Sequence, residues 1–467
     1  MAVLDLNGSS VYSPIYEFFR RLLILILERS AKLRLITVFL FYFTQGIPVG
    51  LFFYAIPAWL AANGASTAAV AGVVSASILP WTLKFFLGFI MDRYTYLPMG
   101  RRRIWIIGAQ STIVVMLILA AILSPGAKEI WLISMLAFLV NSGTAFQDVS
   151  IDSLTVDIMP EDERGKAAGI MFGGQVLGMS VFTFFGGHLI ANYGPMAGYL
   201  TAALFVSSVV VFGIFIYERE GERRFPWSDG DAHPRNVHIQ IKAWKPLLIN
   251  SWKAMLAPIS LVAFAIFCVR TMPSGIAEAY HPGLATNLGG WTQTSYTNTI
   301  SAAQFASGIF ALVLGGRAVT KIGAQRAALI MCILVSVCAI SFGLAHNHWS
   351  NVSLLTAYFW QIEFFATMLI VAFIPIAMRL CNPGVAATQF TLYMAASNVG
   401  RPLGSSIAAA TDNMGVPYLM YFILASVFVV LSIVLWFVRF PTKAPDVVQI
   451  IEQNDPIVEG EPAPKIN

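Results

Sequence analysis

The sequence contains few charged residues. Asp, Glu, Lys and Arg make up 11% of its 467 residues, whereas hydrophobic residues make up 57% and the mean hydropathy is +0.72. Soluble globular chains carry about 25% charged residues. The surface of this chain is therefore suited to a lipid bilayer. Its length accommodates about a dozen spans of roughly 20 residues and leaves no room for a large soluble domain.

Several chemical features are also missing. The sequence has no G-x-x-x-x-G-K-[ST] phosphate loop, so the chain is not expected to hydrolyse ATP. The apolar segments contain no metal-ligand cluster and no nucleophile with a suitable histidine partner. We therefore expect no enzyme activity, cofactor, metal or nucleic-acid partner. The four cysteines lack metal-ligand spacing and are predicted to be packing residues; they are Cys268, Cys332, Cys338 and Cys381.

The apolar segments predict an all-α membrane protein with 12 transmembrane helices in two pseudo-symmetric six-helix bundles. One long polar stretch, residues 218–254, separates two groups of six segments, as is typical of many secondary transporters. The predicted spans are 35–62, 67–91, 104–124, 130–158, 166–190, 195–217, 255–280, 292–315, 325–345, 352–380, 386–411 and 416–438.

The flanking segments have their own composition. Residues 1–34 are predicted to be a cytoplasmic segment in which residues 13–32 form an amphipathic helix along the membrane surface. The first span is expected to serve also as an uncleaved insertion signal. The tail is polar, contains proline and is predicted to be disordered. The N-terminal bundle, cytoplasmic linker, C-terminal bundle and cytoplasmic tail are predicted at 35–217, 218–254, 255–438 and 439–467.

The basic residues predict an orientation. Of the 29 lysines and arginines, only Lys128 falls in a predicted outward loop, and Lys84, Arg270 and Arg401 fall inside spans. All the others lie in the N-terminal segment, the even-numbered connections or the tail. Because cytoplasmic loops are enriched in Lys and Arg, both termini are predicted to be cytoplasmic.

The connection between spans two and three carries a recognisable motif. It reads Gly88-Phe-Ile-Met-Asp92-Arg93, six further residues, and Gly100-Arg-Arg-Arg103. This pattern resembles the G-x-x-x-D-R-x-G-R-R/K signature of the major facilitator superfamily, with a longer insert before the second glycine. Glycine permits the tight turn, the aspartate can meet a helix N-terminus, and the arginines can pair with acidic residues or anionic lipid. The alternative is a basic loop that only sets topology.

Motifs in span four indicate one branch of this superfamily. It carries Gln147-Asp148 and Asp152, followed by Asp157-Ile-Met-Pro160 and Glu163-Arg164-Gly165. Together with Lys84, this is similar to the branch that contains bacterial muropeptide permeases, acetyl-CoA transporters and some siderophore permeases. The similarity is best over residues 40–200. It implies a muropeptide as the first substrate to consider, a ferric siderophore as the next, and acetyl-CoA if the chain is eukaryotic.

Ionisable residues inside a membrane are costly and are therefore functional candidates. Asp148 and Asp152 are four residues apart on one helical face, where two carboxylates can share a proton and serve proton-coupled transport. Alternatively, they are structural and pair with Lys84 or with loop arginines.

The second half offers two cations within spans, Arg270 and Arg401. Guanidinium groups bind carboxylates and phosphates bidentately, which suits an anionic substrate. The alternative for Arg401 is an ion pair with Glu363 or Asp412. The further candidates for substrate or proton binding are Gln45, Gln175, Gln304, Gln361 and Glu363.

A third group is predicted to control the change between conformations. Asp157 lies near the cytoplasmic end of span four, where it is expected to pair with the loop arginines or with Arg164. The gating candidates are Asp92, Arg93, Gly100, Arg101, Arg102, Arg103, Asp157 and Arg164.

These features predict a secondary active transporter that works by alternating access. The expected protein is a monomeric, proton-coupled importer of a polar or anionic solute in the inner membrane of a bacterial cell. A non-transporting sensor that kept the fold is the alternative from another class. The ionisable residues retained within the spans argue against it.

Overall fold

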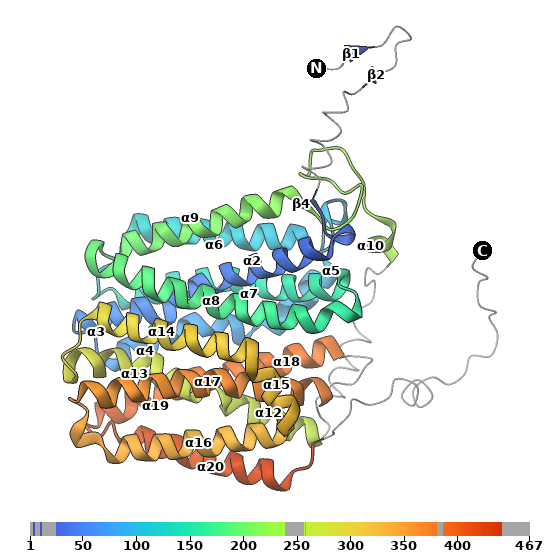
Figure 1. The fold of residues 1–467 in the computed structure, drawn as a ribbon. Coiled ribbons are helices and arrows are strands. Elements are labelled where there is room, and N and C mark those ends of the chain that lie inside the picture. Colours follow the sequence, from blue (N-terminus) through green and yellow to red (C-terminus); the bar gives the residue numbers. More distant parts are fainter. Residues whose placement is uncertain are drawn as a thin grey trace.

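The computed structural model describes residues 25–238, 256, 258–380 and 386–440, together with two short strands near the N-terminus. The described chain is almost entirely helical (Figure 1). The helical segments of the first half are α2 (Ala31–Gly50), η2 (Leu51–Ala55), α3 (Ile56–Ala62), α4 (Thr67–Thr82), α5 (Lys84–Arg93), α6 (Arg103–Leu123), α7 (Ile130–Ile158), α8 (Glu161–Tyr193) and α9 (Pro195–Phe215).

The second half repeats this arrangement after the short helix α10 (Pro234–His238). Its helical segments are α12 (Pro258–Arg270), α13 (Met272–Gly283), η4 (Leu284–Leu288), α14 (Gln293–Phe310), η5 (Ala311–Gly315), α15 (Gly316–Ile322), α16 (Ala324–Leu344), α17 (Val352–Leu380), α18 (Ala386–Asn398), α19 (Gly400–Asn413) and α20 (Leu419–Phe437). Single turns of 3-10 helix lie at η1 (Leu27–Arg29), η3 (Leu97–Met99) and η6 (His346–His348). The strands are β1 (Val3–Leu4), β2 (Ser10–Val11), β3 (Leu25–Ile26) and β4 (Ile216–Tyr217).

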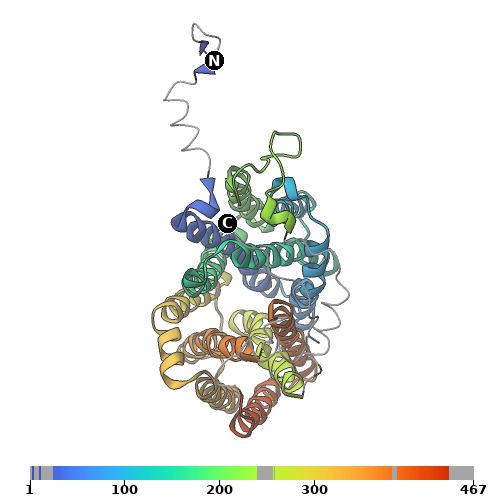
Figure 2. The same cartoon turned by 90° about the vertical axis from the view of Figure 1, so that its right-hand side faces the viewer.

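The two halves form two groups of helices, seen end-on in Figure 2. Within the described residues, ten helical segments are long and apolar enough to cross a membrane. The positions of predicted spans two and eleven are occupied by α4 with α5 and by α18 with α19, each pair interrupted by one residue, Leu83 or Val399. The all-α membrane fold is confirmed. The count of twelve spans stays a prediction.

One end of the molecule carries the basic connections, and we call it the basic end. It comprises residues 94–102, residues 218–238, Gly323, the start of α2 and the end of α20, and it lies at the right in Figure 1. The opposite end carries the turns at residues 63–66, 124–129, 289–292 and 414–418. The sequence predicts that the basic end faces the cytoplasm.

Glycine allows two helix pairs to approach closely. A Cβ atom at Gly178 of α8 would lie 1.9 Å from the Phe43 carbonyl oxygen of α2, and one at Gly46 would lie 2.2 Å from the Gln175 oxygen. The second half repeats this contact between α13 and α19. A Cβ atom at Gly275 would lie 2.1 Å from the Arg401 oxygen. Gly46, Gly178 and Gly275 therefore each allow a neighbouring helix backbone to approach closely.

Gly178→Ala is expected to destabilise the protein by about 3 kcal/mol or more, because the added methyl group overlaps the backbone of α2 and neither helix can yield locally. Gly72→Ala in α4 is a matched control, since a Cβ atom there would meet nothing within 4 Å. Thermal unfolding in detergent should show a clear drop in midpoint for the first variant and none for the second. Equal midpoints would contradict the packing argument.

The first helix of each half is also interrupted in the same way. Pro48 in α2 precedes the π-helical turn η2, and Pro282 in α13 precedes the π-helical turn η4. Proline has no N–H to donate, so the regular hydrogen-bond ladder is broken at these points. The internal repeat is therefore visible in packing and helix geometry.

Of the predicted amphipathic helix at residues 13–32, residues 25–30 are not α-helical, whereas Ala31 and Lys32 begin α2. Residues 13–24 lie outside the described residues. Leu25 and Ile26 form β3, which pairs in parallel with β4, and a 3-10 turn follows. The Arg34 guanidinium donates hydrogen bonds of 3.0 Å to the carbonyls of Leu27 and Glu28, which holds this turn against the start of α2. The predicted disordered tail lies beyond the described residues, apart from Arg439 and Phe440.

Candidate functional site

A buried charge cluster lies within the first half. The Asp148 carboxylate of α7 accepts a hydrogen bond of 2.6 Å from Gln45 Nε2 of α2 and lies 2.7 Å from Lys84 Nζ of α5. All three side chains are buried. The positive and negative charges therefore compensate each other inside the bundle, and the pairing with Lys84 considered for the sequence is present.

Asp152 lies one helical turn from Asp148 and has a different partner. Its carboxylate accepts a hydrogen bond from the Tyr42 hydroxyl of α2. Residues four apart lie on one helical face, so both aspartates face α2. The same face carries Asn141, whose Oδ1 accepts a hydrogen bond of 3.1 Å from the Trp81 indole.

In the second half, two interrupted helices meet. The helix starting at Pro258 breaks at Thr271, and the helix starting at Ala386 breaks at Val399. The Thr271 hydroxyl donates to the Ser397 carbonyl, and Arg270 Nη2 donates to the Ser397 hydroxyl at 3.0 Å. Arg270 is 6% exposed and, among the described residues, has no carboxylate partner.

Arg401 has a partner that the sequence analysis missed. Its Nε lies 3.5 Å from Glu278 Oε1, so the alternative of a buried ion pair is present, but with Glu278 in place of Glu363 or Asp412. Glu278 is completely buried, and within the described part of the chain neither of its carboxylate oxygens accepts a hydrogen bond. The Arg401 guanidinium also lies 4.8 Å from the centre of the Phe53 ring, which belongs to the other half.

Glu278 was not among the candidate residues, although an acidic residue within predicted span seven was a usable signal. The observed helical segment continues through Pro282 to Leu288, and Glu278 is fully buried. Glu363 of α17 is also buried and lies within electrostatic reach of Glu278 and Arg401.

The predicted amides are placed differently from one another. Gln304 of α14 is buried and accepts a hydrogen bond of 3.3 Å from Thr183 of α8, across the two halves. Gln175 of α8 is half-buried, and its backbone carbonyl faces Gly46. Gln361 is exposed and accepts from the Cys338 thiol of α16, so it does not join Glu363. Residues two apart on a helix differ by about 200° in direction, which explains this separation.

A second network lies at the basic end of the first half. The Glu218 carboxylate accepts hydrogen bonds from three consecutive backbone N–H groups, those of Arg101, Arg102 and Arg103, at the start of α6. These N–H groups have no partner within the helix, and a carboxylate there is favoured by the helix dipole. Gly100, with φ +96°, leaves room for Glu218, because a Cβ atom would lie 2.7 Å from Glu218 Oε1.

Asp157 completes this network. Its carboxylate lies 2.9 Å from Arg101 Nη1 and 3.1 Å from Arg102 Nε, so the expected ion pair with the loop arginines is present. Arg219 donates to the Asp157 carbonyl at 3.1 Å. The network joins the end of α7, the start of α6 and the segment after α9. Its gating role stays a prediction, and the side chains of Asp92, Arg93 and Arg164 lie outside the described residues.

Glu222 makes this network sensitive to pH. Its carboxylate accepts hydrogen bonds of 3.0 Å from the Glu218 backbone N–H and the Asn236 amide. Burial, and then the negative charge of Glu218, raises the pKa of Glu222 from 4.5 to about 8, although Arg103 opposes this shift.

A raised carboxyl pKa favours the folded state at low pH, and the contribution is lost as pH rises from about 4.5 to about 8. We expect the unfolding midpoint of the wild type to fall over this range and that of Glu222→Gln to fall less. Thermal unfolding at half-unit pH steps measures the two slopes. Glu129→Gln, at an exposed site, is the control that should keep the wild-type slope; a Glu222→Gln slope equal to the wild type would contradict this account.

Comparison with known proteins identifies the family. The sequence model described as Major Facilitator Superfamily matches residues 35–405. The chain belongs to this superfamily.

Within the described residues, no group of three or more His, Cys, Asp or Glu side chains could hold a metal ion.

Two relatives of this superfamily member are named as a permease and a transporter. It is 25% identical over 364 residues to the anhydromuropeptide permease of Escherichia coli (strain K12), covering 77% of this chain and 70% of that protein. It is 22% identical over 409 residues to a folate-biopterin transporter of Synechocystis sp., covering 85% and 78%. The crystal structure of a D-xylose-proton symporter shares the fold, with a TM-score of 0.66, 13% identity, and coverage of 88% and 99%.

The protein is therefore a multi-pass membrane transporter of the Major Facilitator Superfamily that carries a small-molecule substrate, and its relatives are not enzymes. The resemblance inferred from spans two and four to a branch containing muropeptide permeases is confirmed at the level of the relatives.

Proposed function

We propose that this protein is a proton-coupled importer of an anionic, muropeptide-like solute in the bacterial inner membrane, with both termini in the cytoplasm. Relatedness to the anhydromuropeptide permease supports the substrate class. The concentration of basic residues in the even-numbered connections supports the orientation.

The environment of Arg270 is the observation that supports an anionic substrate. Arg270 is a buried guanidinium that hydrogen-bonds to the Ser397 hydroxyl and, among the described residues, has no carboxylate partner. A buried charge is costly unless it is compensated. Both α13 and α19 begin near Arg270, and helix N-termini attract anions. A substrate carboxylate bound by Arg270 would supply the missing charge.

The pair Glu278 and Arg401 is our candidate for proton coupling. Arg401 neutralises Glu278 within the second half and contacts Phe53 of the first half. Movement between the two halves would change how completely the charge of Arg401 neutralises the Glu278 carboxylate. It would therefore change the affinity of Glu278 for a proton. Glu363, Tyr54 and Tyr296 also lie within electrostatic reach of Glu278.

The test is uptake of labelled anhydromuropeptide into proteoliposomes, with and without an inward proton gradient. We expect gradient-stimulated uptake by the wild type and a loss of at least about 100-fold for Arg270→Ala, because both charge and bidentate hydrogen bonds disappear. Arg317→Ala, at an exposed site outside the cluster, is the control. Uptake that ignores the gradient would exclude proton coupling.

Failure of a folded wild type to take up muropeptide would reject this substrate while leaving the transporter assignment intact. The folate-biopterin relative makes a pterin carrying carboxylates the next substrate to test, followed by a ferric siderophore and acetyl-CoA. Specific binding of a substrate without any transport under either gradient would favour the alternative of a sensor.

A further inference from the structure

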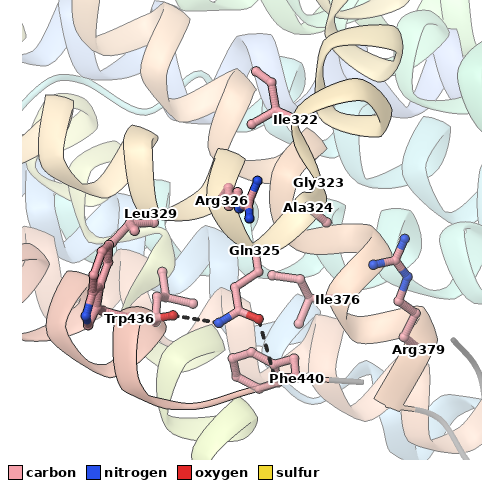
Figure 3. A pocket seen from close by; sticks show the side chains of 11 residues that line it. Ile322, Gly323, Ala324, Gln325, Arg326, Leu329, Ile376, Arg379, Trp436 and Phe440 are labelled. Carbon is pink, nitrogen blue, oxygen red and sulfur yellow. Dashed lines mark hydrogen bonds between the residues drawn. The ribbon is translucent and has the colours of Figure 1, made fainter. Parts of the chain in front are cut away.

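The second half contains a cavity at the basic end that is separate from the charge clusters described above. It has a volume of about 470 Å³ and lies between the start of α16, the end of α17 and the end of α20 (Figure 3). Its lining residues are Ile322, Gly323, Ala324, Gln325, Arg326, Leu329, Ile376, Arg379, Leu435, Trp436 and Phe440. The volume lies within the range of about 300–1,000 Å³ typical of small-ligand sites.

The charged side chains that line this cavity are all positive. Arg326 comes from α16 and Arg379 from α17, and none of the lining residues is acidic. Among the described residues, neither arginine has a carboxylate within ion-pair distance. Figure 3 shows Arg326 next to the turn at Gly323 and Arg379 farther away, beyond Ile376. Two such cations complement a phosphate group.

The rest of the cavity lining is largely apolar. Leu329, Ile376 and Leu435 form part of it, and the Trp436 side chain lies at its edge. Trp436 is 71% exposed at the end of an α20 helix that is otherwise apolar. Tryptophan in such a position is typical of the membrane–water interface. The cavity therefore combines two cationic side chains with an exposed aromatic edge.

Its shape is maintained by Gln325. The side-chain amide donates hydrogen bonds of 2.6 Å to the carbonyls of Leu435 and Val438, and its Oε1 accepts one of 3.3 Å from the Phe440 N–H. Two of these bonds involve carbonyls at the end of α20, which would otherwise lack partners. The contact joins α16 to α20 and keeps the wall of the cavity in place.

We propose that this cavity binds the headgroup of an anionic phospholipid, with the phosphate between Arg326 and Arg379 and the acyl chains beside Trp436. The position at the basic end, the two arginines without a carboxylate partner in the described part of the chain, and the exposed tryptophan support a lipid over a soluble phosphate. This inference is independent of the transported substrate.

The experiment titrates brominated phosphatidylglycerol into the full-length protein in detergent and follows quenching of Trp436, isolated by subtracting the signal of Trp436→Phe. A basic residue near a membrane surface contributes about 1 kcal/mol to binding of an anionic lipid, which is a factor of about 5. Arg326→Gln with Arg379→Gln is therefore expected to raise the half-saturating lipid concentration about 25-fold. Brominated phosphatidylcholine should quench weakly in both proteins.

Arg317→Gln is the matched control, since it removes a basic residue from the same end without lining the cavity. It should leave the titration unchanged, and the unfolding midpoint of every variant is measured to confirm folding. Equal binding of phosphatidylglycerol by the wild type and the folded double variant would overturn the proposal. Displacement of the lipid by millimolar glycerol phosphate would also overturn it, in favour of a soluble phosphate ligand.

Discussion

Glu278→Gln is expected to abolish uptake driven by a proton gradient while leaving substrate counterflow within a few-fold of the wild type. Glutamine has nearly the same shape but cannot change its charge. Glu278 is completely buried, and Arg401 is its ion-pair partner at 3.5 Å. If its protonation links the gradient to movement between the halves, accumulation requires the carboxylate, whereas exchange of substrate down its own gradient does not.

Uptake and counterflow of labelled substrate are measured in the same proteoliposomes. We expect a fall in gradient-driven accumulation of at least about 100-fold, which corresponds to about 2.7 kcal/mol of lost coupling. Glu129→Gln makes the same change at an exposed turn and should keep wild-type accumulation. Full accumulation by Glu278→Gln would remove this residue from the coupling mechanism. If both activities are lost, adding Arg401→Gln removes the remaining unpaired charge, and recovery of counterflow would show that this charge had caused the loss.

The second large effect is expected for the ion pair between Lys84 and Asp148. Lys84→Met and Asp148→Asn should each destabilise the protein by about 3–5 kcal/mol, because each removes one partner of a buried ion pair. The double variant removes both charges and should recover most of that stability. Thermal unfolding of the four proteins gives the coupling energy of the pair directly.

Uptake by the same four proteins separates the two interpretations of Asp148. Because Lys84 and Gln45 already satisfy this carboxylate, we expect the double variant to regain uptake to within a few-fold of the wild type. A stable double variant without uptake would show that Asp148 acts in transport itself. Ser142→Ala, on the same helix, provides a control for substitution in α7, since within the described chain its hydroxyl donates to the Phe138 carbonyl of its own helix and not to the charge cluster.

Part of the candidate site could be predicted from the sequence, because the residues that pair lie at span ends predicted on the same side of the membrane. Asp157 and the arginines at residues 101–103 both fall at predicted cytoplasmic ends, and their pairing is observed. The pairing of Asp148 with Lys84 was one of two alternatives considered. Glu218, by contrast, was not singled out, although an acidic residue directly after span six was a usable signal.

The error over Arg401 has a geometric cause. From the sequence, Glu363 and Asp412 were considered as acids for Arg401, and Glu278 was placed at a span end. The π-helical turn after Pro282 lengthens the observed helix to Leu288. Gly275 then allows α13 to lie directly against the Arg401 backbone, which brings Glu278 to the guanidinium group. A span boundary that is wrong by several residues therefore changed the predicted partner.

The sequence by itself determined three properties of this protein. Its surface suits a lipid bilayer, its apolar segments fall into two groups, and its basic residues gather at one end of the molecule. Those properties follow from local composition, because each span of about 20 residues must be apolar on its own. Only the tertiary structure decided which charges meet, where the helices break and which cations lack an acidic partner among the described residues. These depend on the rotation and contact of helices far apart in the chain, as in the pairs Lys84–Asp148 and Glu278–Arg401.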